Sequence, residues 1–143
     1  MRCNCGIDPK NLTDEHLFAE SRELKMLPAL FGRIGMKHFG QTPTIFTLGK
    51  GHMLFFLYKW EYSLWRYSIC VEELKRRGYN VISESNRWNI YQQFNCLEQY
   101  KETGKEANIV RQRIIERIQN SSKKYFHYNH KRITKEEAIN LLF

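Results

Sequence analysis

The segment MLFFLYKWEYSLWRYSICVEELKRRG, residues Met53–Gly78, decides the predicted fold, because its apolar side chains repeat at alternating steps of four and three residues. This spacing places them along one face of a helix that spans about Met53–Arg77. The face consists of Met53, Leu57, Trp60, Leu64, Tyr67, Val71 and Leu74. Lys59, Arg66 and Glu73 are predicted to lie on a different side. We therefore expect a long aromatic helix at the centre of the core.

Further helices are predicted on both sides of this segment. The first begins after Thr13 or Asp14, either of which can cap it, and ends at about Leu27, because Pro28 disfavours helix in the residue before it. Two more helices are predicted over Glu106–Asn120 and Lys135–Leu142, and a capping box of Thr134 and Glu137 begins the second of them. Turn-rich stretches are expected over Gly32–Gly51 and Gly78–Gly104. The expected fold is mainly α: a compact single domain of residues 1–143 with three main helices and long loops.

The charge of the chain favours a polyanionic partner. The 143 residues carry 23 Lys and Arg against 15 Asp and Glu, a formal net charge of +8, and 42% of them are hydrophobic. Residues 101–143 hold 10 basic and 5 acidic side chains, so the excess is greatest in the C-terminal third. A chain of 143 residues is too short for a large multidomain protein. Nucleic acid is the first candidate partner, with a basic face that serves only solubility as the alternative.

The cysteines and the apolar runs indicate the expected compartment. Cys3, Cys5, Cys70 and Cys96 are too few and too irregularly spaced for a disulfide framework, which favours a reducing environment. No second Cys or His pair accompanies the first two, so buried thiols are favoured over a zinc site and no metal is predicted. There is no signal-peptide pattern, and no apolar run is long enough to span a bilayer. We expect a cytoplasmic protein, or a nuclear one if the host has a nucleus.

The first predicted helix carries candidate groups for chemistry. His16, Glu20 and Glu23 follow at steps of four and three, so they share one face, and Glu23 borders the apolar stripe of that helix. A carboxylate at such a border can be partly desolvated. Arg22 lies about 100° round the helix and could contact a phosphate. The alternative is a solvated face in which Glu20 or Glu23 pairs with a neighbouring base.

Two later motifs are compatible with phosphate contacts. Gly49–His52 could let backbone N–H groups approach an anion, but its spacing is not that of a nucleotide-binding loop, and His52 more often caps a helix or packs in a core. Arg113 and Arg117 are four residues apart on one helix face, and the chain then passes through Lys123 and Lys124 to the aromatic run 125–128. Bases interleaved with aromatics suit phosphates and unstacked bases. The alternative is that these aromatics pack back onto the core.

Several blocks, in order along the chain, resemble a known family. They are LTDEHLFAESREL (Leu12–Leu24), PTIFTLGKGHMLFFLYK (Pro43–Lys59), LKRRGYNV (Leu74–Val81) and EANIV (Glu106–Val110). Together they resemble the pyrimidine-dimer DNA glycosylases, which have AP-lyase activity and bacteriophage members that repair ultraviolet damage. The resemblance implies a compact helical fold and a bifunctional reaction that needs no cofactor.

In that reaction an N-terminal α-amine attacks C1′ of the damaged nucleoside, a Schiff base forms, and β-elimination nicks the strand. An α-amine ordinarily titrates at about 7.7–8.0, so part of it is neutral and nucleophilic at physiological pH. The bulk of Arg2 normally blocks removal of Met1, and alignment of Arg2–Asn4 places Met1 at the position of the nucleophile. We therefore predict the Met1 α-amine as nucleophile. Glu23 matches the catalytic glutamate that stabilises positive charge at the sugar and assists proton transfer.

The resemblance also implies a DNA-binding set and two departures. The positions that match the family are Arg2, His16, Arg22, Arg113 and Arg117. Lys123 and Lys124, further along the chain, are also predicted to bind DNA. The arginine expected soon after the catalytic glutamate has no counterpart, and Lys25 or Arg33 could replace it. Lys124 stands where the family has Trp, so the preferred lesion can differ.

The expected partner is double-stranded DNA containing a damaged base. We expect the protein to bind it as a monomer and to have no membrane partner. Two alternatives stay open: a related glycosylase and lyase for another modified or abasic nucleotide, and an inactive duplex-binding module. A metal-dependent nuclease is disfavoured because the acidic residues form no further cluster.

Overall fold

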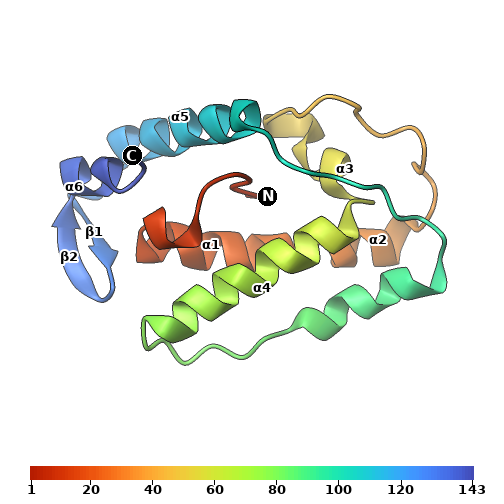
Figure 1. The fold of residues 1–143 in the computed structure, drawn as a ribbon, viewed down its shortest axis with the longest axis horizontal. Coiled ribbons are helices and arrows are strands. Elements are labelled where there is room, and N and C mark those ends of the chain that lie inside the picture. The colour runs from red at the N-terminus through yellow and green to blue at the C-terminus, as the bar shows by residue number, and fades with distance from the viewer.

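The computed structural model of residues 1–143 is mainly helical, which confirms the predicted fold class (Figure 1). The α-helices are α1 (Asp14–Leu24), α2 (Met26–Ile34), α3 (His52–Phe56), α4 (Trp60–Arg76), α5 (Gly104–Asn120) and α6 (Lys135–Asn140). Two antiparallel strands, β1 (Tyr125–Tyr128) and β2 (Lys131–Thr134), pair in the register Tyr125↔Thr134. Short 3₁₀ segments are η1 (Pro9–Asn11), η2 (Gly49–Gly51) and η3 (Ser85–Gln93).

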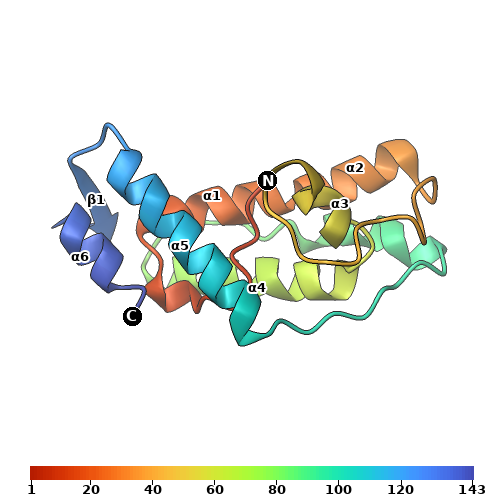
Figure 2. The ribbon, with the colours of Figure 1, turned by 90° about the horizontal axis from the view of Figure 1, so that it is seen from above.

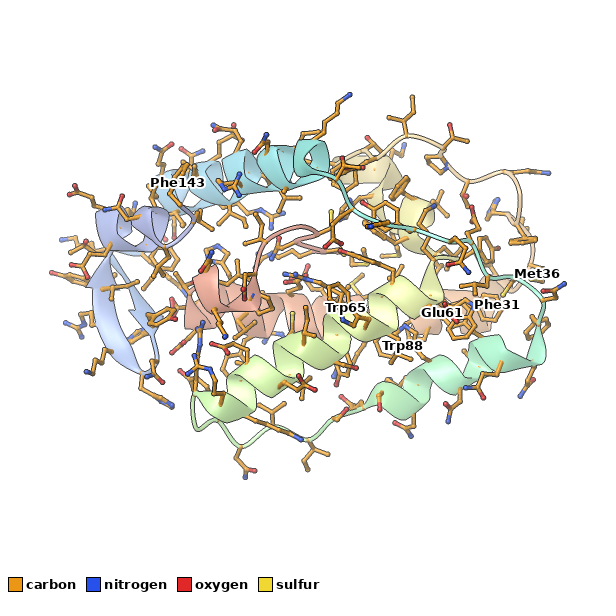
Figure 3. The ribbon with its side chains drawn as sticks, viewed as in Figure 1. Phe31, Met36, Glu61, Trp65, Trp88 and Phe143 are labelled. Atoms are coloured by element: carbon orange, nitrogen blue, oxygen red, sulfur yellow. The ribbon has the colours of Figure 1, made fainter.

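Helices α1 and α4 pack together, and α5 lies opposite them, with the N-terminal segment between (Figure 1). Figure 2 shows the hairpin and α6 at one end of the molecule and α2 and α3 at the other. A single cluster of buried apolar side chains connects these elements. Figure 3 labels Trp88 of η3 beside α4. Trp88 packs on Tyr67 of α4, and its Nε1 donates to Ser63 Oγ at 2.9 Å. None of the helices is both long and apolar enough to cross a bilayer.

The long helix predicted over Met53–Arg77 is interrupted, so that prediction was wrong in its continuity. The break falls at Leu57–Lys59, where Lys59 has φ −88° and ψ 51°. Tyr58 is fully buried there, and its hydroxyl donates to Gly35 O at 2.7 Å. Apolar residues lie on both sides of the break, and the turn lets both halves face the core.

The side of α4 predicted to be separate from the core is itself buried. Lys59, Arg66 and Glu73 are only 7%, 2% and 5% exposed. Each has an opposite charge nearby: Lys59 Nζ lies 3.8 Å from Glu98 Oε2, and Arg66 and Glu73 are held in shorter ion pairs described below. Pairing is what makes burial of such groups tolerable.

The first helix also differs from its prediction. Thr13 caps α1 as expected, since its Oγ1 accepts from the backbone N–H of His16 at 3.2 Å. However, α1 ends at Leu24, and α2 continues through Pro28 to Ile34. Proline is tolerated there because it lies in the first turn of α2, where its missing N–H would have no partner within the helix.

The C-terminal part contains a hairpin that was not predicted. Helix α5 is confirmed, and a capping box of Thr103 and Glu106 starts it two residues earlier than expected. Helix α6 is confirmed with a shorter end, at Asn140. Between them the chain turns at Asn129 and His130, which have φ values of 53° and 70°. Two consecutive left-handed residues are typical of a tight hairpin turn.

Candidate nucleic-acid interface and active site

The N-terminal amine and Glu23 lie side by side. The Met1 amine is 3.8 Å from Glu23 Oε1, and Arg2 Nε is 3.3 Å from Glu23 Oε2. Glu23 lies in the last turn of α1 and its side chain is 29% exposed, so a substrate can reach it. The structure thus brings together the two groups that the sequence predicts to be catalytic.

The amine borders a small basic cavity of about 120 Å³. Its wall is formed by the chain start, the loop before α3 and one face of α5, with the residues Met1, Arg2, Cys3, Asn4, Leu48, Gly49, His52, Val110, Arg113 and Arg117. Glu23 lies just outside this wall, in contact with Met1 and Arg2. The larger cavity of about 500 Å³, between residues 6–10 and α4, contains neither the amine nor Glu23.

Positive charge is concentrated at this cavity. Partial burial lowers the pKa of Arg117, and the neighbouring charges of Arg2 and Arg113 lower it further. Arg113 and Arg117 lie on one face of α5, as predicted, and both are only partly exposed. Like charges held this closely favour an anionic ligand, and guanidinium groups suit phosphate oxygens.

Two wider hollows adjoin the cavity and share Arg2 with it. One, of about 440 Å³, includes Arg22, Lys123 and the aromatic pair Phe18 and Tyr79. The other, of about 460 Å³, includes His16, Arg117 and Lys123. The structure therefore joins most of the predicted DNA-binding residues in one continuous surface.

Three of the predicted binding residues lie elsewhere. The ammonium of Lys25 is paired with Glu84, and Arg33 is exposed at the end of α2. Lys124 is exposed just before β1. None of them lines the basic cavity or the two hollows that adjoin it.

His16 is buried rather than free on the helix surface. Burial, with Arg2, Arg117 and Lys123 nearby, lowers the pKa of His16 to about 4. Its Nδ1 lies 2.7 Å from Thr13 Oγ1, and its ring stacks on Phe126 of β1 at 5.7 Å. The imidazole is therefore neutral at physiological pH and adds no positive charge to the surface.

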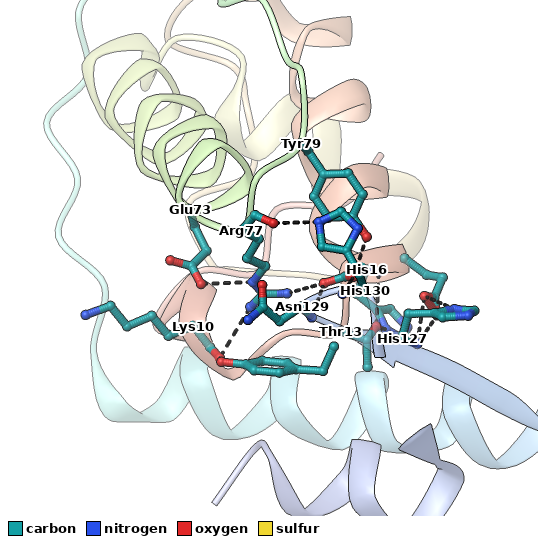
Figure 4. A network of polar contacts seen from close by, with 12 residues as sticks. Lys10, Thr13, His16, Glu73, Arg77, Tyr79, His127, Asn129 and His130 are labelled. Atoms are coloured by element: carbon teal, nitrogen blue, oxygen red, sulfur yellow. Dashed lines mark hydrogen bonds and ion pairs between the residues drawn. The ribbon is translucent and has the colours of Figure 1, made fainter. Parts of the chain in front are cut away.

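The start of α1 is joined to the hairpin by a network of polar contacts (Figure 4). Asp14 accepts from the backbone N–H groups of Asn129 and His130 at 3.0 and 2.9 Å, and from Arg77 Nη1 at 2.7 Å. Burial opposes its ionisation, but these bonds and one from Tyr79 outweigh burial and lower the pKa of Asp14.

Glu15 holds the same hairpin at a second point. Its carboxylate accepts from the backbone N–H of His127 at 2.9 Å and lies 3.1 Å from the ring Nδ1. Since Phe126 is buried against His16, that residue of the aromatic run packs onto the core, as the alternative reading proposed. The hairpin is thereby fixed beside Lys123.

Two buried groups beside residues 1–4 lie outside the predicted catalytic and DNA-binding residues. His52 is buried, its Nδ1 lies 2.9 Å from Thr47 O, and burial lowers its pKa. Glu20 forms an ion pair with Arg66, so it has a basic partner as the alternative proposed, but the pair is buried in the core and not on a solvated face. No local pattern pairs Glu20 with Arg66, since the two residues are 46 positions apart on helices that meet only in the fold.

Comparison with known families places this geometry in context. Residues 3–87, more than half of the chain, match the model of a family described as pyrimidine dimer DNA glycosylase. The match includes His16, Arg22 and Glu23, and it ends before α5 and the hairpin. A search of curated proteins finds no match to the chain.

Proposed function

This chain belongs to the pyrimidine dimer DNA glycosylase family, and we propose that it excises ultraviolet-induced pyrimidine dimers from duplex DNA and then cuts the strand as an AP lyase. Membership implies a DNA glycosylase whose substrate is DNA. The observation that carries the proposed mechanism is the Met1 amine at 3.8 Å from Glu23 Oε1, beside a basic cavity.

The first step is nucleophilic attack by the amine. The nitrogen lone pair of Met1 forms a bond to C1′, the glycosidic bond breaks, and its electron pair leaves with the damaged base. Loss of a proton from nitrogen and opening of the sugar ring give the Schiff base. In this proposal Glu23 stabilises the positive charge that develops at C1′, since a carboxylate close to such a charge lowers the barrier.

The second step is β-elimination. Glu23 assists removal of a proton from C2′, the electron pair forms the C2′–C3′ double bond, and the C3′–O bond breaks with the phosphate as leaving group. Arg2 Nε contacts the other oxygen of Glu23 and thus orients the carboxylate. Hydrolysis of the imine then releases the amine for another turnover.

The basic surface serves to hold the DNA backbone around the lesion. Arg113 and Arg117 approach the cavity from α5, while Arg22 and Lys123 line the adjoining hollow. The reacting C1′ lies inside an intact duplex, so we propose that a nucleotide leaves the stack before the amine reaches it. A monomer contains every group that this mechanism uses.

Reductive trapping tests the proposal. The protein is incubated with borohydride and one of three duplexes: irradiated, abasic or undamaged. A covalent complex is expected with the first two and not with the third, and intact-mass analysis should show an unmodified Met1. Absence of a complex with both damaged duplexes would exclude the mechanism, and a complex with the abasic duplex alone would assign the protein to another lesion.

A further inference from the structure

The proposed nucleophile is a chain terminus, and a terminus needs an anchor if it is to react from one position. Terminal residues of most domains are poorly ordered unless other contacts hold them. Here the anchor lies at Asn4, three residues from the amine. Its backbone N–H donates to Glu20 Oε2 at 2.7 Å, and its Nδ2 donates to Glu20 Oε1 at 3.2 Å. One carboxylate thus holds both the backbone and the side chain of Asn4.

Glu20 is itself fixed by a two-point ion pair with α4. Arg66 Nε donates to Glu20 Oε2 at 2.7 Å and Arg66 Nη2 donates to Oε1 at 2.8 Å. Glu20 is fully buried and Arg66 is 2% exposed. The two parallel bonds leave little freedom to either side chain.

The same arginine holds the segment at a second place. Arg66 Nη1 donates to Ile7 O at 2.6 Å, and the backbone N–H of Ile7 donates to Asn4 O at 3.1 Å. Gly6 lies within this turn at φ +80°, and a Cβ there would come within 2.6 Å of Ala107 Cβ on α5. The segment is thereby enclosed by α1, α4 and α5.

Helix α1 carries both the anchor and the group beside the amine. Glu20 and Glu23 are three residues apart, so they are separated by about 4.5 Å along the helix axis. Asn4 is bound at the first and Met1 lies at the second. One rigid turn of helix therefore sets the distance between the amine and the carboxylate that works with it.

A buried ion pair is weak evidence for a contribution to stability, because apolar residues of similar volume often replace it without loss. In this pair, the Glu20 carboxylate also accepts two bonds from Asn4, and Arg66 Nη1 donates to Ile7 O. Both side chains therefore hold the N-terminal segment. We propose that Glu20 and Arg66 are positioning residues that fix the Met1 amine against Glu23 and the reacting sugar. The inference rests on the proposed use of the Met1 amine as nucleophile.

The test measures the rate of imine trapping by borohydride with saturating abasic duplex, together with duplex affinity and thermal stability. Glu20→Gln leaves Arg66 without its charge partner and loosens Asn4. A shift of about 1 Å in a reacting group can cost about 100-fold in rate, and we expect a loss of that order with unchanged duplex affinity. Asn4→Ala removes one of the two bonds, and we expect a loss of about fivefold.

The matched control is Glu73→Gln. Glu73 is also buried and accepts from Arg77 Nε at 2.9 Å, but its carboxylate bonds only to Arg76 and Arg77 and to no residue of the segment 1–7. A purely structural role lowers the melting temperature and the fraction of protein that reacts, without changing the rate constant of the folded fraction. We expect that behaviour from Glu73→Gln only.

The outcomes separate this inference from the proposed function. If the wild-type protein forms no trapped complex, both are overturned. If it does, and Glu20→Gln and Asn4→Ala trap at the wild-type rate, the positioning role alone is overturned. Should Glu20→Gln fail to fold, Asn4→Ala decides: a slower rate constant with unchanged affinity supports the role, and an unchanged rate constant refutes it.

Discussion

Acidification should destabilise the protein through His16. Burial and the nearby charges of Arg2, Arg117 and Lys123 lower the pKa of this histidine to about 4 from 6.5. Between these values the unfolded chain binds a proton at His16 and the folded chain does not. The free energy of unfolding therefore rises with pH in this interval, and the stability is present above about pH 6.5 and lost as pH falls.

The size of the effect follows from the same two pKa values. Complete titration of His16 is worth about 3 kcal/mol. Between about pH 7 and pH 5 the contribution falls by about 2 kcal/mol, because the unfolded histidine is almost fully protonated at the lower pH while the folded one is still neutral.

Urea unfolding at both pH values, for the wild-type protein and for His16→Gln, measures this contribution. The variant loses the stacking on Phe126 and should be less stable at neutral pH. Its further loss on acidification should be smaller than the wild-type loss by about 2 kcal/mol. His52, whose pKa is also lowered by burial, is present in both proteins and cancels. An equal loss in the two proteins would refute the buried, neutral state of His16.

Three further outcomes are expected. Glu23→Gln should slow strand cleavage at an abasic site by about 10²-fold to 10⁴-fold, and gel-shift titration should show unchanged duplex affinity; retained cleavage would remove Glu23 from the mechanism. Arg117→Ala should reduce the slope of log affinity against log salt by about 0.9, as expected for one lost phosphate contact, whereas an unchanged slope would place the DNA elsewhere. Asp14→Asn should lower the free energy of unfolding by about 3 kcal/mol, because it leaves the buried Arg77 without its full charge partner; calorimetry showing no change in melting temperature would contradict this.

Local patterns predicted most of the helices but not their junctions. The capping signals at Thr13 and Thr134 and the period of α4 and α5 act within a few residues, so they can be recognised in one sequence. The break at Leu57–Lys59 contains Tyr58, whose hydroxyl donates to Gly35 O, and no local pattern contains that long-range bond. The apolar period continues through the break because both halves face the same core.

The hairpin was missed for a related reason. Its turn residues, Asn129 and His130, lack the glycine that usually marks a left-handed pair. They are held by the carboxylate of Asp14, which is more than a hundred residues away in the sequence. Such long-range contacts decide the local conformation and leave no short-range signal.

The candidate site shows the same division. Spacing alone placed Glu20 and Glu23 on one face of α1, but it could not distinguish the buried anchor from the accessible carboxylate. The resemblance to the family assigned Glu23 and the amine, and the structure brings them within 3.8 Å. The partner of Glu20 is Arg66, 46 residues away, so the pair became visible only once α1 and α4 were packed together.

The most direct test of the central claim is to identify the atom that bonds to DNA. Protein trapped with borohydride on an abasic or irradiated duplex is digested, and the peptide that carries the sugar adduct is sequenced by mass spectrometry. The adduct is predicted on the α-nitrogen of Met1, and chemical acetylation of that nitrogen should abolish trapping. An adduct on a lysine side chain, or undiminished trapping by the acetylated protein, would contradict the account.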